Sequence, residues 1–315
     1  MKLPFFPIAA SHMAERVDRL YLGLLLISAF FLALIFLPML YFLFKYRRGK
    51  MLSHRKLKFA TWKLEVIWTL IPLFMLLCLF GWAATIYYDE ERPPARTLEA
   101  FVVAKQWMWK IQHAEGNREI NELHVPTGQA VKLTMTSEDV IHSFYIPAMR
   151  LKQDVVPGRY VTEWFEPTRP GTYHLFCAEF CGADHSLMGG NIVVMKPADY
   201  QAWLNAGRPV DNLAATGEHL FREFGCSGCH QNSTVVHAPR LEGVFGKPVP
   251  LQGGAITTAD EQYIRDSILL PASQIAVGYS NVMPSYTGRV SEEQLIQLIA
   301  YIKSLGNQTP PEETK

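Results

Sequence analysis

Cysteine is scarce in this chain, and neither sign of charge is in excess. The 315 residues include five cysteines, an odd number that does not suit a disulfide framework. The formal net charge is +1, so no basic surplus points to nucleic acid as a partner. These shortages argue against a disulfide-stapled scaffold and against a DNA- or RNA-binding protein.

A continuous apolar run is missing before Leu20, so the N-terminus does not have the pattern of a cleaved secretory signal. Two such runs follow, at 20–44 and 66–87. Each is long enough, at about 1.5 Å of helix rise per residue, to cross a hydrocarbon core of about 30 Å. We therefore predict a hairpin of two transmembrane helices; a pair of buried core helices is the alternative.

The connection between the two runs is strongly basic. Its charged residues, none of them acidic, are Lys45, Arg47, Arg48, Lys50, Arg55, Lys56, Lys58 and Lys63. The segments that flank the hairpin mix both signs of charge. The positive-inside rule then places the connection in the cytoplasm. We expect a protein of the bacterial cytoplasmic (inner) membrane with both termini, and everything from about Asp89 onward, on the periplasmic side.

Beyond the hairpin the character of the chain changes twice. Short runs rich in valine, threonine and aromatic residues alternate with proline and glycine turn signals, which predicts an all-β sandwich or barrel. These runs are 101–103, 131–135, 160–165, 172–176 and 191–195. Helical patterns follow, ending in an amphipathic helix that begins after Ser291. The predicted units are an arm and hairpin (1–92), a β domain (93–204), a linker (205–214), an all-α domain (215–308) and a tail (309–315).

Metal-binding residue types are concentrated in twelve residues, which include Cys177, Cys181, His185 and Met188. Thiolate, imidazole and thioether are soft or borderline ligands of the kind that favour copper. A blue-copper site needs one cysteine, whereas two thiolates on a tight loop can bridge two copper ions. A second histidine must then come from elsewhere in the β domain, and His142 is the best candidate because it lies in a strand-like apolar run. A disulfide between the two cysteines is the alternative.

A second redox motif follows in the helical domain. Cys226-Ser-Gly-Cys229-His230 has the spacing that attaches a c-type haem, with the histidine as proximal ligand. Zinc knuckles and redox dithiols share the C-x-x-C half of this motif. The remaining cysteine, Cys78, lies within the second apolar run and is best explained as a small packing residue.

The sixth ligand of such a haem is expected to be a methionine, because thioether ligation raises the iron potential and suits electron transfer. Met283 is the only methionine after Met195 and stands shortly before the last predicted helix. His219 and His237 are competitors, and His219 is too close to the attachment motif to reach the far face of the haem.

The copper segment, together with Asp139-Val-Ile-His-Ser-Phe144, resembles the copper-A region of subunit II of haem-copper cytochrome c oxidases. The resemblance runs from Val17 to about Trp203 and departs from the commonest pattern at Phe144 and Met108, neither of which is a ligand position. With the haem motif included, the chain resembles subunit II of caa3-type oxidases, which carry a fused cytochrome c.

This resemblance implies a cupredoxin fold for the β domain and a class I cytochrome c fold for the helical domain. It assigns Cys177 and Cys181 as bridging thiolates and His142 and His185 as terminal nitrogens of copper-A. Met188 would be the weak thioether ligand, and the backbone carbonyl of Glu179 the remaining one. The Glu179 carboxylate would face a magnesium site shared with the catalytic subunit, since carboxylates suit that hard ion.

The resemblance suggests roles for three further residues. Trp107 would be the ring through which electrons reach the copper, although a tryptophan in this strand also suits the sandwich core. Glu65 would stand at the mouth of a proton channel into the catalytic subunit, although it could simply be an interfacial residue. The carbonyl of Pro239 would orient His230.

Two redox centres on one chain predict an electron-input subunit of a respiratory, proton-translocating terminal oxidase. Neither apolar run contains a histidine, so the oxygen-reducing centre must belong to a catalytic subunit I. The donor could be cytochrome c, another periplasmic carrier or a quinol-oxidising complex. A nitric oxide reductase with a copper-A subunit, and a membrane-tethered copper carrier or redox sensor, remain the alternative functions.

Overall fold

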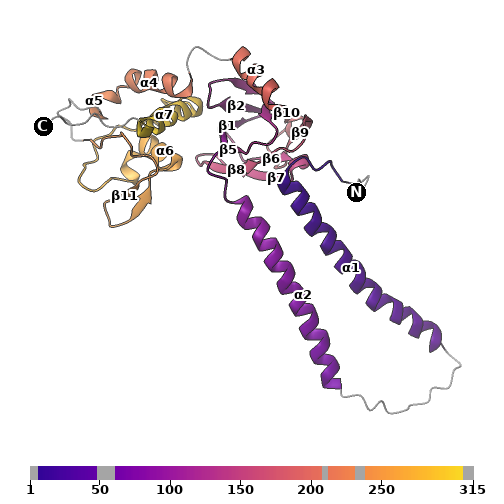
Figure 1. The fold of residues 1–315 in the computed structure, drawn as a ribbon. Helices are drawn as coiled ribbons and strands as arrows, with labels where there is room; N and C mark the ends of the chain where they lie inside the picture. Colours follow the sequence, from indigo (N-terminus) through magenta and orange to yellow (C-terminus); the bar gives the residue numbers. More distant parts are fainter. Residues whose placement is uncertain (1–5, 48–60, 208–211, 231–237, 308–315) are drawn as a thin grey trace.

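A computed structural model describes residues 6–47, 61–207, 212–230 and 238–307, which form a helical hairpin, a β-sandwich and a small helical domain (Figure 1). The basic connection of the hairpin lies largely outside the described residues, as do the middle of the predicted linker, His237 and the predicted tail. The expected fold class, a two-helix hairpin followed by an all-β and an all-α domain, is what the structure contains.

The hairpin consists of α1 (His12–Lys45) and α2 (Thr61–Glu90). Both helices are longer than the predicted apolar runs because they continue into the polar flanks. Ser11 begins α1, and its hydroxyl oxygen accepts a hydrogen bond from the backbone N–H of Ala14. By length and composition both helices could cross a membrane, and their apolar side chains are mostly exposed along the described length.

Two five-stranded sheets pack face to face in the β domain. The first has the order β3 (Arg118–Ile120), β2 (Met108–His113), β1 (Leu98–Lys105), β5 (Val131–Ser137) and β8 (Val161–Phe165). The second has the order β4 (Glu122–Pro126), β10 (Gly189–Met195), β9 (Gly171–Cys177), β6 (His142–Ile146) and β7 (Leu151–Val155). All five predicted runs coincide with strands, whereas β2, β3, β4 and β7 were not predicted.

The sandwich core lies between the two sheets and is built from alternating residues of their strands. Trp109, Leu123, Phe144 and Ile192 are among its fully buried side chains. A short helix, α3 (Pro197–Gly207), follows the last strand. The copper segment connects β9 to β10, and its residues Cys177, Cys181 and Met188 pack into the sandwich core.

The N-terminal segment is joined to the β domain before α1 begins. The backbone N–H of Ala10 donates to the carbonyl of Ala148, and the carbonyl of Ala10 accepts from Thr168, both at 2.8 Å. Arg150 adds a bidentate pair with Asp18 of α1, with both N–O distances at 2.9 Å. The first helix is therefore anchored to the sandwich by backbone and side-chain contacts.

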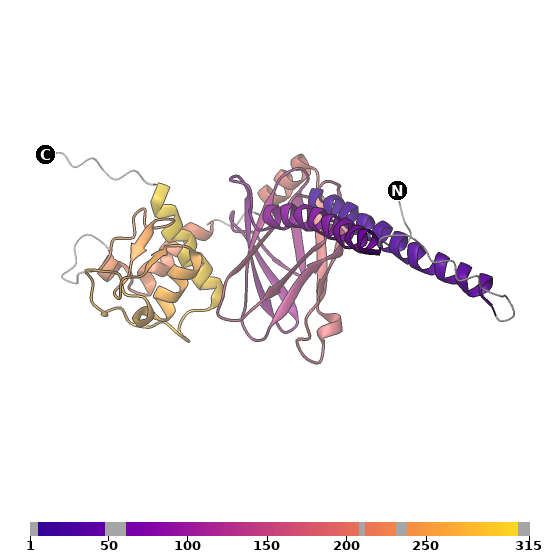
Figure 2. The ribbon, with the colours of Figure 1, turned by 90° about the horizontal axis from the view of Figure 1, so that it is seen from below.

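The helical domain contains α4 (Leu213–Glu223), α5 (Ser227–His230), α6 (Glu261–Leu269) and α7 (Glu292–Ser304), with a small hairpin of β11 (Pro248–Pro250) and β12 (Ile256–Thr258). Ser291 and Gln294 form a capping box at the start of α7, where the sequence predicted an N-cap. Helices α4 and α7 cross closely at Gly217. Figure 2 shows α7, drawn in yellow, lying next to the sandwich.

Candidate copper centre and haem crevice

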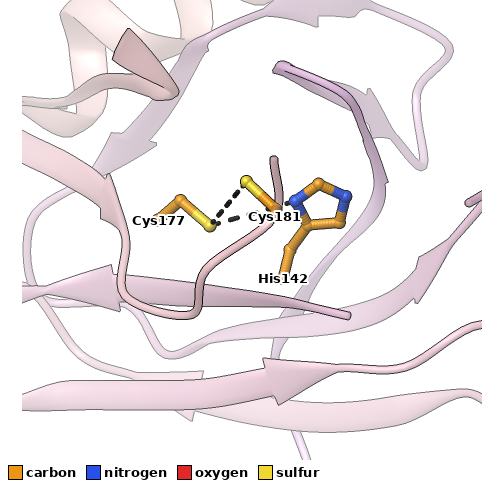
Figure 3. A group of neighbouring side chains, drawn as sticks. All are labelled: His142, Cys177 and Cys181. Carbon is orange, nitrogen blue, oxygen red and sulfur yellow. Dashed lines mark hydrogen bonds between the residues drawn. The ribbon is translucent and has the colours of Figure 1, made fainter. Parts of the chain in front are cut away.

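The six groups that the sequence singles out for copper lie together at one end of the sandwich. Cys177 ends β9, His142 begins β6, and the others lie on the connection to β10, where His185 starts a 3-10 turn (His185–Leu187). Figure 3 shows the two sulfurs and the His142 ring pointing toward one another. Cysteine, histidine and carbonyl donors from two strands and one loop thus meet in a single cluster.

The distances within the cluster centre on the two sulfurs. The Cys177 and Cys181 Sγ atoms are 3.7 Å apart, and neither cysteine forms a disulfide. Cys177 Sγ lies 3.9 Å from His142 Nδ1 and 3.2 Å from the carbonyl oxygen of Glu179. Cys181 Sγ lies 3.5 Å from His185 Nδ1 and 3.7 Å from Met188 Sδ. Each sulfur therefore has one imidazole and one weaker donor beside it.

The two thiols differ in how readily they ionise. For Cys177, hydrogen bonding to His142 outweighs burial and lowers the pKa below the usual value. For Cys181, burial and the neighbouring Cys177 raise the pKa. Two adjacent thiolates are thus stable only beside a positive charge. Two sulfurs, two imidazole nitrogens, a thioether and a carbonyl fit a binuclear copper site better than a hard cation.

Asp139, which the sequence reasoning did not assign a role, orients His142. Its Oδ1 lies 2.8 Å from His142 Nε2, and its Oδ2 accepts a 2.8 Å hydrogen bond from the backbone N–H of Gln106. Burial alone would raise the pKa of Asp139, but these hydrogen bonds lower it. A carboxylate behind a ligand imidazole fixes the tautomer and leaves Nδ1 for the metal. The signal in the sequence is the position of Asp139, three residues before the histidine.

Trp107 packs against the copper loop from the β1–β2 turn. A Cβ on Gly182 would lie 2.9 Å from Gln106 Nε2 and 3.3 Å from the Trp107 ring, so only glycine permits this approach. Gln106 Nε2 also donates to the carbonyl of Cys181 at 2.7 Å. Trp107 is only partly buried, whereas Trp109 is fully buried in the core beside His142.

Two other predicted residues lie on the surface of the chain. The Glu179 side chain is exposed at the copper end, beside Phe180 and Leu187, which are 76% and 78% exposed. Glu65 lies exposed near the start of α2, far along the hairpin from the sandwich (Figure 1). Among the described residues, neither carboxylate belongs to the group of ligand atoms, from His142, Cys177 and Cys181, that lie within 4.8 Å of one another.

The haem motif opens onto an apolar crevice in the helical domain. Cys226, Cys229 and His230 line it together with Met283. His230 Nδ1 lies 2.8 Å from the carbonyl oxygen of Pro239, as the resemblance implies, so Nε2 is free for iron. Because two thiols, an imidazole and a thioether line one apolar crevice, the residues present fit a covalent haem.

Met283 is better placed as a sixth ligand than His219. Met283 is partly buried against the domain core and lines the crevice. His219 is 81% exposed and pairs with Glu223 on the outside of α4. The other competitor, His237, lies outside the described residues.

Comparison with known families divides the chain into three matched segments. The transmembrane domain of cytochrome c oxidase subunit II matches residues 1–82, its periplasmic domain matches residues 97–196, and cytochrome c matches residues 214–306. The three segments follow one another in the order in which the structure places hairpin, sandwich and helical domain.

Two similar relatives cover most of the chain. A cytochrome c oxidase subunit 2 from Alkalihalophilus pseudofirmus is 32% identical over 77% of this chain and 73% of its own length. One from Bacillus sp. strain PS3 is 28% identical over 83% of this chain and 80% of its own length. Among solved structures, the periplasmic domain of subunit II of cytochrome oxidase of Bradyrhizobium japonicum is 27% identical over 37% of this chain and 96% of that chain, with a TM-score of 0.36. On the strength of the first relative and the three matched segments, the chain belongs to the cytochrome c oxidase subunit 2 family, in a form that carries a cytochrome c domain.

Proposed function

We propose that this chain holds a binuclear copper centre and a covalent haem c, and that it passes electrons from an external donor to the oxygen-reducing subunit of a terminal oxidase. Membership of the family makes it an electron-input subunit of such an oxidase. The observation that carries the proposal is the convergence of two thiols, two imidazoles, a thioether and a carbonyl around Cys177 and Cys181.

The residues of the chain have distinct roles in this proposal. Cys177 and Cys181 would hold the copper as shared thiolates, and His142 and His185 would hold it through their imidazoles. Cys226 and Cys229 would attach the porphyrin covalently, and His230 and Met283 would hold its iron. When bound, the copper pair and the haem iron each change oxidation state by one electron, which is the chemistry that a relay needs.

The copper end is the surface that we assign to the catalytic subunit. Phe180 and Leu187 are large, apolar and more than three-quarters exposed there, and such patches mark interaction sites. Glu179 is exposed beside them and would supply its carboxylate to a shared magnesium ion. Trp107 is proposed as the ring that receives electrons, and Glu65 as a carboxylate at a proton-channel mouth.

Replacement of Cys181 by serine tests the copper assignment in the purified complex. We expect loss of the near-infrared band and of the mixed-valence electron paramagnetic resonance signal, with the haem bands unchanged. Cys78→Ser is the matched control, because Cys78 lies exposed on α2 away from both centres. Survival of both copper signals in Cys181→Ser would refute the bridging role.

Replacement of Met283 by alanine tests the haem assignment. Loss of the thioether should lower the iron potential and open the iron to carbon monoxide. An unchanged carbon monoxide spectrum would place the sixth ligand elsewhere. His219→Gln, on the exposed side of α4, is the control and should change neither property.

A further inference from the structure

The helical domain is docked on the outer face of the first sheet, through α4 and α7. Phe101 and Val103 of β1 point away from the sandwich core and pack against Leu213 and Ile296. All four side chains are at most 5% exposed. A strand of an open sandwich would have polar residues on this face, so the buried apolar pair identifies a built contact between the domains.

Charge pairs surround this apolar contact. At one end Lys110 Nζ of β2 lies 2.6 Å from Glu293 Oε1 of α7. At the other end Lys303 Nζ of α7 lies 2.8 and 2.9 Å from the two carboxylate oxygens of Glu99 in β1. We call these four residues the charge latch. Hydrogen bonding to Glu293 and Glu138 outweighs burial and raises the pKa of Lys110, which keeps the latch charged near neutral pH.

Helix α6 adds polar contacts that close the same interface. Arg265 is 6% exposed, and its Nη1 donates to the carbonyl of Gly158 at 3.0 Å. The backbone N–H of Tyr160 donates to Gln262 Oε1 at 2.8 Å. Burial raises the pKa of the Tyr160 phenol strongly, as expected for a side chain enclosed between two domains.

Two faces of helix α7 make different contacts, one with the haem crevice and one with the sandwich. Leu298 and Ile302 line the haem crevice, whereas Ile296 packs on β1. The crevice is therefore separated from the sandwich by α7. In Figure 1 α7 lies between the sandwich and α5, and Figure 2 shows α7 next to the sandwich.

The copper ligands belong to the second sheet and to the loop beyond its end, which the first sheet reaches only through the β1–β2 turn at Gln106 and Trp107. Cys177 and His142 belong to β9 and β6 of the second sheet, while the contact uses β1 and β2 of the first. A helix is roughly 10 Å thick and packed sheets are roughly 10 Å apart, so about 20 Å of protein separates the crevice from the copper-bearing sheet. The rate of electron tunnelling between two centres falls exponentially with the thickness of protein that separates them.

The rim of the haem crevice remains open in the docked arrangement. Residues 267–288, which form much of this rim, contain no charged side chain. Leu270, Val277 and Val282 are 55%, 55% and 59% exposed. An uncharged, apolar rim suits a redox partner whose own centre is surrounded by apolar surface, and docking does not cover it.

We propose that the docked arrangement is the state in which the haem domain receives electrons, and that the charge latch must open before the crevice rim can turn toward the copper end. The inference rests on the proposed relay and adds a conformational step to it. One electron leaves the reduced haem iron, which becomes oxidised, and the oxidised copper pair is reduced by that electron. No further reactant is required.

Cross-linking the latch tests the inference in the assembled oxidase. Glu99→Cys combined with Lys303→Cys, bridged by a short bismaleimide, holds α7 on β1; the two single variants treated with the same reagent are the controls. An external donor should reduce the haem as fast in the bridged protein as in the controls. Stopped-flow absorbance measures this rate. Reduction of the copper, read from loss of the near-infrared band of its oxidised form, should slow by at least roughly tenfold. Equal copper reduction in bridged and control proteins would overturn the inference, and so would failure of the bridge to form.

A charge exchange provides a second test that needs no cross-link. Lys110 also lies 3.0 Å from Glu138, so the exchange is made in a Glu138→Gln background, which is the reference for its rates. Lys110→Glu and Glu293→Lys each place like charges together and should speed haem-to-copper transfer, while the double variant re-pairs the charges and should restore the rate of that background. One surface pair of this kind shifts a docking equilibrium by up to roughly fivefold. Backbone hydrogen exchange at 101–103 should rise in the single variants and recover in the double. Unchanged hydrogen exchange and unchanged haem-to-copper transfer rates in all three variants would overturn the inference about the charge latch. Absence of haem-to-copper transfer in the wild type would instead refute the proposed relay.

Discussion

At the scale of single residues, the proposed copper site includes a side chain, Asp139, that is not one of its proposed metal ligands. Asp139 bonds His142 Nε2 and the backbone of Gln106, so it links the ligand histidine to the turn that carries Trp107. Its removal would leave a fully buried imidazole free to rotate or change tautomer.

We predict that Asp139→Ala lowers copper affinity by roughly 10- to 100-fold, the usual effect of losing a carboxylate behind a ligand histidine. The measurement is copper retained during titration with a chelator, read from the near-infrared band. Asp154→Ala is the control, because Asp154 is a surface carboxylate of the same sandwich that bonds Ser143 and Lys152. Equal copper loss in both variants would contradict a specific role for Asp139.

Glu163 of β8 is a carboxylate whose charge is costly in the folded chain. Burial, with the nearby Glu90 and Glu91, raises its pKa to about 7. Because the folded pKa is raised, this group's contribution to stability is fully present below about pH 4.5, the ordinary pKa of a glutamate, and is lost as pH rises through about 7.

Replacement of Glu163 by glutamine should therefore stabilise the chain at pH 8 and have little effect at pH 4.5. The largest gain is about 3 kcal/mol, from a shift of more than two pKa units at about 1.4 kcal/mol each. Thermal unfolding of the detergent-solubilised protein across this pH range measures it. A gain that is the same at both pH values would show that the carboxyl charge is not the cause.

Much of the candidate site could be predicted from residue spacing, because Cys177, Cys181, His185 and Met188 lie within one short loop. His142 could be chosen because it lies in an apolar strand. Asp139 could not be assigned a role, since its bond to His142 depends on how the loop before β6 turns. The pairing of Lys110 with Glu293 spans 183 residues and has no local signal.

At the scale of elements, the close crossing of α4 and α7 depends on a glycine, Gly217, which has no side chain. A Cβ on Gly217 would lie 1.9 Å from the carbonyl oxygen of Gln297, so the two helices approach backbone to backbone. The helical pattern of this segment was visible in the sequence, but the need for glycine at this position was not.

Gly217→Ala should destabilise the helical domain by about 2–3 kcal/mol, because overpacking forces α4 and α7 apart. Loss of haem absorbance during chemical unfolding reports the change. Ala215→Ser, at an exposed position of the same helix, should have little effect. A stable Gly217→Ala variant with native haem spectra would show that the crossing can relax.

Strand β1 shows what periodicity can and cannot reveal. Its residues Ala100 to Ala104 are buried without interruption, because alternate side chains enter the sandwich core and the contact with α7. The continuous apolar run was correctly interpreted as a strand. A continuous apolar run is also typical of a strand covered on both faces, but neither this cover nor the helix that supplies it was predicted.

At the scale of the whole molecule, the charge bias of the hairpin predicts a definite orientation. A C-terminal epitope should be accessible to antibody in intact spheroplasts, because both redox domains are expected outside. A cysteine introduced by Lys63→Cys should react with an impermeant maleimide only after permeabilisation. Labelling of Lys63→Cys in intact cells would show that the topology is the reverse of the predicted one.

The anchoring of Ala10 and Asp18 to the sandwich has a consequence for assembly. Because the segment before α1 is bonded to Ala148 and Arg150, the elevation of the copper loop over the lipid headgroups is determined within this polypeptide. A catalytic subunit would therefore meet the copper loop at a height above the membrane that this chain has already set.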